Sequence, residues 1–409
     1  MKTKTLFDKK SALTVIFFTV FIYLVGFGVI IPLIPILSRD FGATALQTGL
    51  LMSCYSAMQF LFAPFWGKLS DRWGRRPILI FCLLGEFFSY LLLAHAQSLE
   101  MLFVARTLAG FFGASISTAS AYISDITGPE ERSKGMALIG AAFGLGFVIG
   151  PTIGGIFLHL SENHLEDKNF GMMGTSYFVA ALCLLNFLFA LKFLKESLHE
   201  KNLEKKPHRL KLIYSYLNRK TVGPLIVSFF LSSLAMSSME ATLILFMGEK
   251  FAWSAKEVSF GFAYIGIIMI FTQGFLVRRL LPLWGERKVL RLGLLLFMLG
   301  FIEICLSNSI LNMAVAMTFL SLGQGLVNPS LMGSISLLVD SKEQGVTMGV
   351  NQGLSSLGRI IGPALGGAVY GSIGIRAPFF VSAAMALIAI LLVQINYSHI
   401  PVSAKLKGS

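Results

Sequence analysis

The chain has 409 residues, of which 55% are hydrophobic and 13% are charged, and its formal net charge at pH 7 is +13. A soluble protein of this length needs far more charge to cover its surface, so the composition excludes a soluble globular protein. The basic residues lie in short stretches beside apolar blocks, which is typical of the cytoplasmic side of a bilayer and not of a nucleic-acid-binding surface. The sequence therefore predicts a multi-pass membrane protein.

Twelve apolar segments are long enough to cross a hydrocarbon core, and they must be helical because lipid offers the backbone no hydrogen-bond partners. A long polar connector separates the sixth segment from the seventh. We therefore expect an all-α membrane protein with an N-terminal six-helix bundle at 1–194, a cytoplasmic linker at 195–221 and a C-terminal six-helix bundle at 222–409. The expected helices span 12–37, 44–66, 77–97, 100–123, 134–158, 174–194, 222–247, 257–279, 288–308, 311–337, 346–370 and 375–397.

The distribution of Lys and Arg predicts the orientation. The N-terminus, the 67–77 and 124–134 connectors, the linker and the stretch 278–291 are rich in basic residues, and the alternate connectors are not. By the positive-inside rule, we expect both termini on the cytoplasmic side, with the first segment kept as an uncleaved span.

The cysteine pattern and the short motifs predict neither a metal nor a cofactor. All four cysteines fall inside apolar segments, with no CxxC pair and no histidine at ligand spacing. No G-x-x-x-x-G-K-[ST] motif occurs, so we do not expect ATP to drive the protein. No nucleophile–base constellation is visible either, so we do not expect an enzyme.

The chain contains an internal repeat. GLGFVIGPTIGG at 144–155 recurs as SLGRIIGPALGG at 356–367, which places Pro151 and Pro363 212 positions apart (363 − 151). Trp73 and Trp284 are 211 positions apart (284 − 73). Two copies at one offset predict two pseudo-symmetric bundles of the same orientation, an arrangement suited to alternating access in transporters.

Three motifs carry a family resemblance. The turn GKLSDRWGRRP at 67–77 contains the pattern G-x-x-x-D-R-x-G-R-R, and RTLAGFFGA at 106–114 places an arginine before small residues in helix four. With the glycine-rich fifth helix, they resemble the major facilitator superfamily over the whole chain, and within it bacterial tetracycline/proton and multidrug/proton antiporters. The motif residues are Gly67, Asp71, Arg72, Gly74, Arg75 and Arg76 in the turn, and Gly146, Gly150, Pro151, Gly154 and Gly155 in helix five.

The resemblance implies roles for two of these motifs. In the turn, Gly67 and Gly74 would permit a tight bend, and Asp71 would contact the N-terminus of helix eleven near Thr347 as a conformational gate. The helix-five motif would be a hinge between the halves that is typical of antiporters. Ordinary close packing by small residues is the alternative interpretation of helix five.

The acidic positions depart from those of the resembling antiporters. The helix-one acid of the tetracycline antiporters falls at Tyr23 and Leu24, and their helix-three acid falls at Ser89, one turn after Glu86. The helix-seven acid of the multidrug exporters matches Glu240. The resemblance therefore favours proton coupling more than it favours tetracycline as the substrate.

Three ionisable residues inside expected spans are the candidates for proton coupling, since each costs roughly 2.5–3.5 kcal/mol to insert. They are Glu240 in helix seven, Glu86 in helix three and Arg106 in helix four. Glu86 could instead be a protonated structural residue, and Arg106 could form a structural ion pair with it. By resemblance, Arg106 would control proton release from a carboxylate.

Polar stripes on the expected helices predict a central substrate cavity. Arg359 in helix eleven would suit anionic or zwitterionic substrates, or it would balance the charge of Glu240. Uncharged polar residues can also join helices together. The candidate cavity residues are Tyr55, Gln59, Ser237, Gln273, Gln324, Asn328, Asn351, Ser355 and Arg359.

The functional prediction is a proton-coupled antiporter of the cytoplasmic membrane that exports an amphipathic small molecule, either a drug-like compound or a metabolite. Its expected partners are that substrate, protons and the bilayer, without nucleic acid, and we expect a monomer. The alternatives are an exporter of lipids or siderophore-like metabolites, a proton-coupled nutrient importer of the same fold, and a membrane sensor that does not transport.

Overall fold

The computed structural model describes residues 2–127, 142, 145–146, 149–157, 169–198, 209–339 and 343–396, and the regular elements in these ranges are helical. Contacts between Cα atoms divide the chain into two compact units. The first contains residues 1–43, 54–205 and 254–263, and the second contains 44–53, 206–253 and 264–409. The predicted bundle boundaries at 194 and 222 remain predictions.

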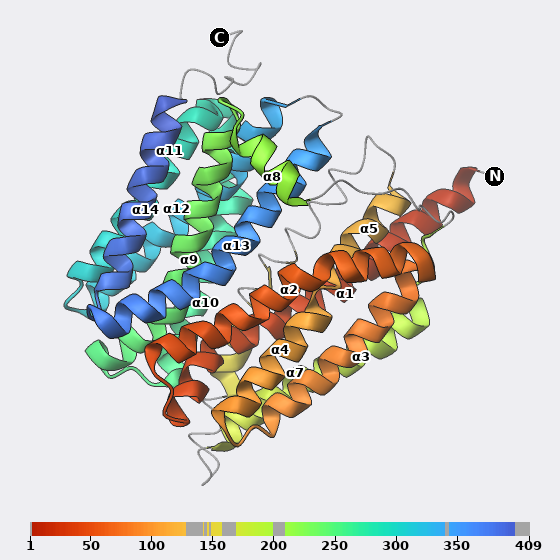
Figure 1. Ribbon diagram of the computed structural model, residues 1–409, viewed down its shortest axis with the longest axis horizontal. Helices are drawn as coiled ribbons and strands as arrows, with labels where there is room; N and C mark the ends of the chain where they lie inside the picture. Colours follow the sequence, from red (N-terminus) through yellow and green to blue (C-terminus); the bar gives the residue numbers. More distant parts are fainter. Residues whose placement is uncertain are drawn as a thin grey trace. The chain divides into compact units, whose positions relative to one another are not determined.

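The helices of the first half lie in the red-to-yellow part of Figure 1. α3 packs against both α4 and α7, and α1 packs against α7 and α5. Residues 149–157 of the expected fifth helix are also helical. The helices are α1 (Lys2–Asp40), α2 (Ala45–Trp73), α3 (Arg75–Ala94), α4 (Leu99–Gly113), α5 (Ile116–Ile126) and α7 (Asn169–Phe193).

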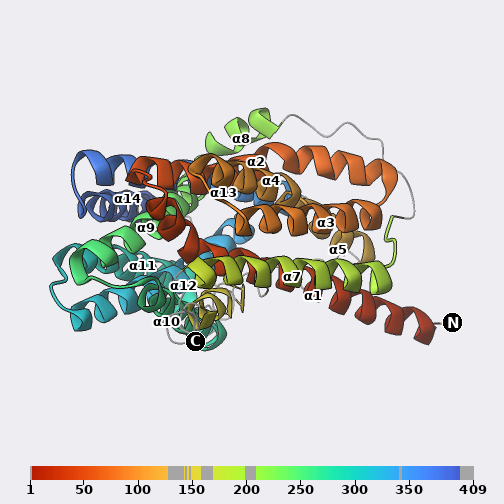
Figure 2. The same ribbon diagram turned by 90° about the horizontal axis from the view of Figure 1, so that it is seen from below.

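In the second half, α9 packs against α13 and α14, and α11 packs against α12 and α14. The short α8, drawn in light green in Figure 2, packs against α9 and α13. The elements are α8 (Arg209–Leu217), α9 (Gly223–Phe251), α10 (Ala255–Phe271), the π-helix η1 (Thr272–Leu276), α11 (Val277–Leu306), α12 (Ile310–Leu337), α13 (Gln344–Ser372) and α14 (Ala377–Ile395).

The membrane-spanning character of the chain is clear from its helices. Within the described ranges, eight helical runs are long and apolar enough to cross a bilayer, and one of them, Lys256–Leu306, is long enough for two crossings. α2 and α13 are each 29 residues long, and 149–157 represents helix five. Together these elements account for the twelve expected helices.

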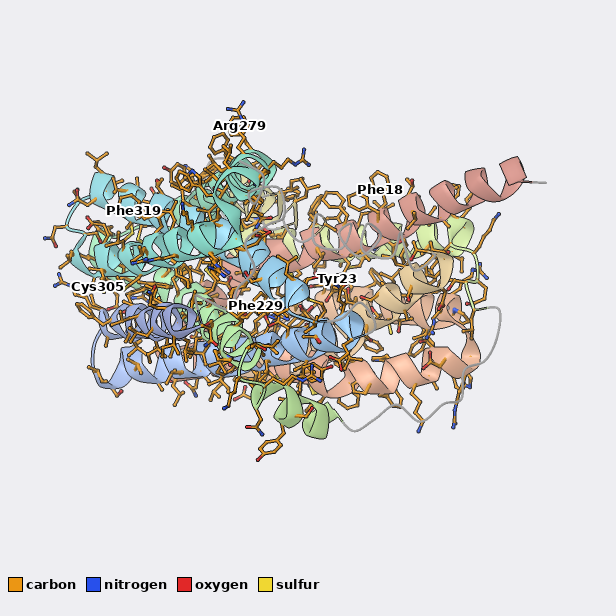
Figure 3. The ribbon with its side chains drawn as sticks, turned by 90° about the horizontal axis from the view of Figure 1, so that it is seen from above. Phe18, Tyr23, Phe229, Arg279, Cys305 and Phe319 are labelled. Atoms are coloured by element: carbon orange, nitrogen blue, oxygen red, sulfur yellow. The ribbon has the colours of Figure 1, made fainter. Side chains whose placement is uncertain are left out.

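Side chains on the outer surface are apolar, as lipid requires. Phe18 on α1 is 45% exposed, whereas Tyr23, just over one turn later, is only 6% exposed and lies among the helices (Figure 3). The interior of the first unit is closed by fully buried residues such as Ile16, Leu24 and Tyr122. Any charged group inside such a unit is therefore separated from water and needs an explanation.

Two helix boundaries differ from those predicted. Gly67 does not form the turn, because α2 continues through it to Trp73, and of the two glycines of the turn only Gly74 has a positive φ, 107°. Helix four is interrupted after Gly113. The basic stretch 278–291 contains a break in α11 at Gly285 (φ 73°, ψ 165°), which lies between the predicted helices eight and nine.

The glycine-rich fifth and eleventh helices approach their partners closely. A Cβ atom at Gly150 would lie 2.6 Å from the backbone of Gly28 in α1. In the second unit, a Cβ at Gly362 of α13 would lie 2.7 Å from the carbonyl of Leu234 in α9. Since real Cβ atoms do not make such contacts, both helix pairs depend on the missing side chain.

Candidate functional site

The first polar site is built around Glu86 in the middle of α3. Its side chain is 1% exposed, and neither carboxylate oxygen has a hydrogen-bond partner among the described residues. Burial of a polar group without a partner is costly, and for a charge it is prohibitive, so this carboxyl is suited to carry a proton. The sequence-based candidate thus lies in a dry interior position.

A chain of hydrogen bonds lies beside Glu86. The hydroxyl groups of Tyr23 on α1 and Tyr55 on α2 are hydrogen-bonded to each other. Gln59 Nε2 donates to the Tyr23 hydroxyl (3.2 Å) and to the carbonyl of Gly113 (3.1 Å). Two of the predicted cavity residues, Tyr55 and Gln59, are therefore brought together with Tyr23, which the sequence analysis did not place in the site.

Arg106 on α4 completes this first site. Its guanidinium lies over the ring of Tyr55, 4.4 Å from the centroid, in a cation–π arrangement. Arg106 is 4% exposed, and its Nε and Nη1 atoms have no hydrogen-bond partner in the described structure. Glu86 and Arg106 interact electrostatically, but within the described ranges they do not form the ion pair that the sequence analysis offered as an alternative.

The second polar site lies between α9 and α13. Ser233 and Ser355 are hydrogen-bonded across the two helices (2.7 Å), and Arg359 donates to Ser355 (3.2 Å) and Ser356 (3.1 Å). Glu240, two turns beyond Ser233 on α9, is half-buried and interacts electrostatically with Arg359. In contrast to Glu86, Glu240 keeps part of its surface accessible.

The other predicted cavity residues of the second unit are dispersed. Gln273 is half-buried in η1, and π-turns often mark functional positions in helices. Gln324 is 7% exposed with an unpartnered Oε1, and Asn351 is fully buried with both amide atoms unpartnered in the described part of the chain. Asn328 is half-buried, and Ser237 is buried against Gly362.

Gly325 of α12 packs against the π-helix η1. A Cβ atom there would lie 2.7 Å from Cγ2 of Thr272, the first residue of η1. The first residue of η1 therefore fills the space that a side chain at position 325 would need.

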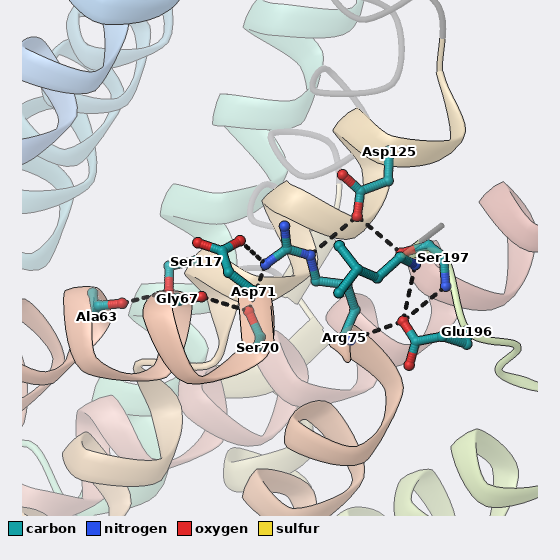
Figure 4. Close-up of polar contacts among 10 residues, drawn as sticks. Ala63, Gly67, Ser70, Asp71, Arg75, Ser117, Asp125, Glu196 and Ser197 are labelled. Carbon is teal, nitrogen blue, oxygen red and sulfur yellow. Dashed lines mark hydrogen bonds and ion pairs between the residues drawn. The ribbon is translucent and has the colours of Figure 1, made fainter. Parts of the chain in front are cut away.

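A charge network surrounds the junction of α2 and α3 (Figure 4). The guanidinium of Arg75 contacts Asp71 (2.6 Å), Ser70 (2.6 Å) and Asp125 at the end of α5 (3.0 Å). The carboxylate of Glu196 accepts hydrogen bonds from the backbone N–H groups of Arg75 (2.8 Å) and Arg76 (3.1 Å).

Glu196 thus caps the N-terminus of α3, where the unpaired N–H groups and the helix dipole favour an anion. Arg72 is exposed, and Arg76 donates from its side chain to the carbonyl of Leu191 at the end of α7 (2.8 Å). The predicted contact of Asp71 near Thr347 joins the two units and remains a prediction.

Sequence reasoning missed four residues of these sites: Tyr23, Gly113, Asp125 and Glu196. Tyr23 and Gly113 look like ordinary apolar and small residues of a span. Asp125 and Glu196 lie 50 and 121 positions from Arg75, with which they interact. Their acidic side chains at the ends of apolar helices were the only available signal.

The comparisons with known proteins agree with this architecture. The family model of the Major Facilitator Superfamily matches residues 16–283 and 225–407. The chain belongs to the major facilitator superfamily. It is therefore a multi-pass membrane transporter and not an enzyme.

Curated relatives include tetracycline and multidrug resistance proteins. The chain is 33% identical to the tetracycline resistance protein, class C, of Escherichia coli over 371 residues, covering 88% of this chain and 90% of the relative. It is 31% identical to the class B protein of Escherichia coli, covering 84% and 85%. It is 27% identical to multidrug resistance protein 2 of Bacillus subtilis (strain 168), covering 92% of each chain.

Solved structures share the fold. The human organic anion transporter MFSD10 (TETRAN) has a TM-score of 0.71 at 26% identity, covering 94% of this chain and 99% of that one. A bacterial homolog of the human lysosomal transporter Spinster has a TM-score of 0.77 at 15% identity, covering 95% and 96%. The second likeness concerns the fold alone.

Proposed function

We propose that the protein exports an amphipathic small molecule across the cytoplasmic membrane in exchange for protons, by alternating access. The observation that carries this proposal is Glu86: a carboxyl that is 1% exposed, has no hydrogen-bond partner in the described structure and interacts electrostatically with Arg106. A carboxyl that is closed off from water is favoured in its protonated form. Binding and release of a proton at Glu86 would therefore be linked to the conformations in which water reaches this residue.

Glu240 has a different part in the proposed mechanism. It is half-buried, and its neighbours Ser233 and Ser237 give α9 a polar face. A carboxylate in this setting binds a cationic group of a substrate or a proton, but not both. Competition between substrate and proton at Glu240, together with proton binding at Glu86, couples export of the substrate to entry of protons.

The cytoplasmic charge network supports the gating role of the 67–77 segment. Arg75 is 6% exposed and is held by Asp71 and Asp125, so the end of α2 is tied rigidly to α3 and α5. In the proposal, Asp71 also interacts with the start of α13 when the cytoplasmic side is closed. The close packing of Gly146 and Gly150 against α1 supports helix five as the hinge.

A second candidate substrate class is an organic anion. The guanidinium of Arg359 donates to Ser355 and Ser356, and one similar solved structure is that of an organic anion transporter. We further propose that both termini are cytoplasmic, because the basic connectors lie on the same side of the membrane as the termini. We also propose that a single copy of the chain carries out transport.

The test is a substrate panel in everted membrane vesicles with a fluorescent reporter of the pH gradient. Tetracycline, ethidium and an anionic dye are added to energised vesicles containing the wild type or Glu240→Gln. We expect ethidium to release protons with the wild type and not with Glu240→Gln. If no compound of the panel moves protons, or if Glu240→Gln is fully active, the proposal is wrong.

A further inference from the structure

Three polar side chains from three different helices, Tyr23, Tyr55 and Glu86, have oxygen atoms that surround one point. That point is the position that a Cβ atom at Gly113 would occupy, at 2.7 Å from the Tyr23 hydroxyl, 2.9 Å from the Tyr55 hydroxyl and 3.1 Å from Oε1 of Glu86. All three side chains are at least nine-tenths buried. The absence of a side chain at Gly113 is therefore what allows the three oxygens to lie together.

Resting on the proposed function, we propose that the Tyr23–Tyr55 hydroxyl pair is a reversible hydrogen-bond switch that accommodates Glu86 in both its protonated and its ionised form. Tyr23 and Tyr55 are positioning residues in this proposal, since the proton itself is carried by Glu86. In this proposal, Tyr23 on helix one takes the place of the acidic residue that the resembling antiporters have there.

The break in helix four provides the backbone carbonyl at which the hydrogen-bond chain of this switch ends. The N–H of Ser117 donates to the carbonyl of Ala114 (3.3 Å), one residue beyond the partner it would have in a continuous helix. The Gly113 carbonyl instead accepts from the side chains of Gln59 (3.1 Å) and Tyr23 (3.4 Å). The interruption between α4 and α5 thus turns a backbone acceptor toward the tyrosine pair.

The hydrogen bonds of the pair can run in two directions, because a hydroxyl is both donor and acceptor. Neither Glu86 oxygen has a hydrogen-bond partner among the described residues, so in the proposed switch the carboxyl turns toward Tyr55. With Glu86 protonated, its hydroxyl then donates to Tyr55, Tyr55 donates to Tyr23, and Tyr23 donates to the Gly113 carbonyl. With Glu86 ionised, Tyr23 donates to Tyr55, and Tyr55 donates to the carboxylate. Gln59 donates to the Tyr23 oxygen in both states and holds it in place.

The proton balance is simple. On release, the O–H bond of the Glu86 carboxyl breaks and a water molecule of the aqueous pathway takes the proton as hydronium. The two tyrosines keep their own protons and only rotate their O–H bonds. On loading, the same steps run in reverse, and no tyrosinate forms at any stage.

Among the groups around Glu86, the Tyr23–Tyr55 pair is the best suited to hydrogen-bond with its carboxyl. Arg106 lies over the face of the Tyr55 ring and donates no hydrogen bond to Glu86 in the described structure. The thiols of Cys82 and Cys183 are weak hydrogen-bonding groups. Tyr90, a third buried tyrosine, interacts electrostatically with Glu86 but does not share the hydrogen-bonded chain. The titratable groups around Glu86 are Tyr23 of α1, Tyr55 of α2, Cys82 and Tyr90 of α3, Arg106 of α4 and Cys183 of α7.

The test is an infrared pH titration of the purified protein in lipid, following the C=O band of the protonated carboxyl that Glu86→Gln removes. Tyr55→Phe and Tyr23→Phe withdraw donors from the carboxylate, and bonds to a charged acceptor are the stronger ones. We expect the midpoint of the titration to move to higher pH by about one unit in Tyr55→Phe, and by less in Tyr23→Phe. Gly113→Ala, which pushes the oxygens apart, moves it in the same direction.

Tyr90→Phe is the matched control, since it removes a buried hydroxyl near Glu86 from outside the chain, and we expect an unchanged midpoint. An unchanged midpoint in Tyr55→Phe, an equal shift in Tyr90→Phe, or the lack of any band that Glu86→Gln removes would overturn the switch. The titration requires no substrate, so it can succeed when the vesicle panel fails and can fail when the panel succeeds.

Discussion

Gly74 in the first half and Gly285 in the second half are 211 positions apart and have similar backbone conformations, with φ 107° and ψ 154° in one and φ 73° and ψ 165° in the other. The close packing repeats as well: Gly150 contacts α1, and Gly362, 212 positions later, contacts α9. The two halves therefore share the positions at which the backbone needs glycine.

The charged residues do not repeat. With the same offsets, Glu86 corresponds to Phe297, Asp71 to Pro282, and Arg359 to Phe147. Phe297 is fully buried in its own unit, so this position of the fold can be filled by an apolar side chain. The second half therefore folds without a charge at the position of Glu86, in agreement with the proposed role of this residue in transport.

The largest expected effect separates the two acids. Glu240→Gln removes the accessible carboxylate, and we expect it to weaken ethidium binding at neutral pH by about tenfold or more, because a charged contact is lost. Glu86→Gln leaves the half-buried site intact, and we expect ethidium binding within about twofold of the wild type. Fluorescence titration of the purified variants measures both, and equal losses would show that the two sites are not distinct.

The shared scaffold is tested by alanine at the close contacts. Gly150→Ala and Gly362→Ala each place a Cβ against the backbone of a neighbouring helix, and we expect a loss of about 1–3 kcal/mol in the free energy of unfolding. Gly349→Ala in α13 is the control, because no atom lies within 4 Å of its Cβ position. Thermal unfolding of the three variants in detergent measures the effect; a loss in only one half would contradict a shared scaffold.

Asp71, an acid with no counterpart in the second half, is expected to affect the transport rate more than the stability. Asp71→Asn keeps the hydrogen-bonding shape but removes the charge, and Arg75 retains Asp125. We expect normal membrane insertion and transport slowed by about three- to tenfold, since a gate contact of this kind contributes of the order of 1 kcal/mol. Glu286→Gln, at the position equivalent to Arg75 in the other half, should leave the rate unchanged; normal transport by Asp71→Asn excludes the gate.

The smallest effect is expected at the linker. Arg219 forms a two-point ion pair with Glu343 (2.6 and 3.2 Å) and lies over the ring of Tyr216. The hydrogen bonds from Arg219 lower the pKa of Glu343 below its ordinary value of 4.5. A carboxyl with a depressed pKa stabilises the folded state above its ordinary pKa, and the contribution is lost as the pH falls through the lowered value.

We therefore expect Arg219→Ala to increase amide hydrogen exchange in α8 by roughly two- to fivefold at pH 7. The difference from the wild type should vanish at a pH below the folded-state pKa of Glu343, when the carboxyl is protonated. Hydrogen-exchange mass spectrometry of both proteins measures it. A difference that persists in acid would assign the effect to the contact with Tyr216 instead.

Much of the fold could be predicted from the sequence because the signals are local. Apolar length predicts each span, and the Gly-Pro repeat predicts the two-fold design. Helix ends were less predictable: α2 continues through Gly67 to Trp73, while Gly74 has a positive φ.

The candidate site was predicted in part. Glu86, Arg106 and Glu240 are recognisable because a charge inside an apolar span stands out. Tyr23 is not, since a tyrosine fits an apolar helix and its partners Tyr55 and Gly113 lie 32 and 90 positions away. Such contacts depend on helix packing, which the local pattern does not encode.

The most direct test of proton coupling at the buried acid compares two assays of Glu86→Gln in proteoliposomes. We predict that ethidium exchange between the two sides continues at equal concentrations, since that movement needs no proton release. Uphill accumulation driven by a pH gradient should fall by about two orders of magnitude. If Glu86→Gln accumulates ethidium against its gradient as well as the wild type does, the buried carboxyl does not carry the coupled proton.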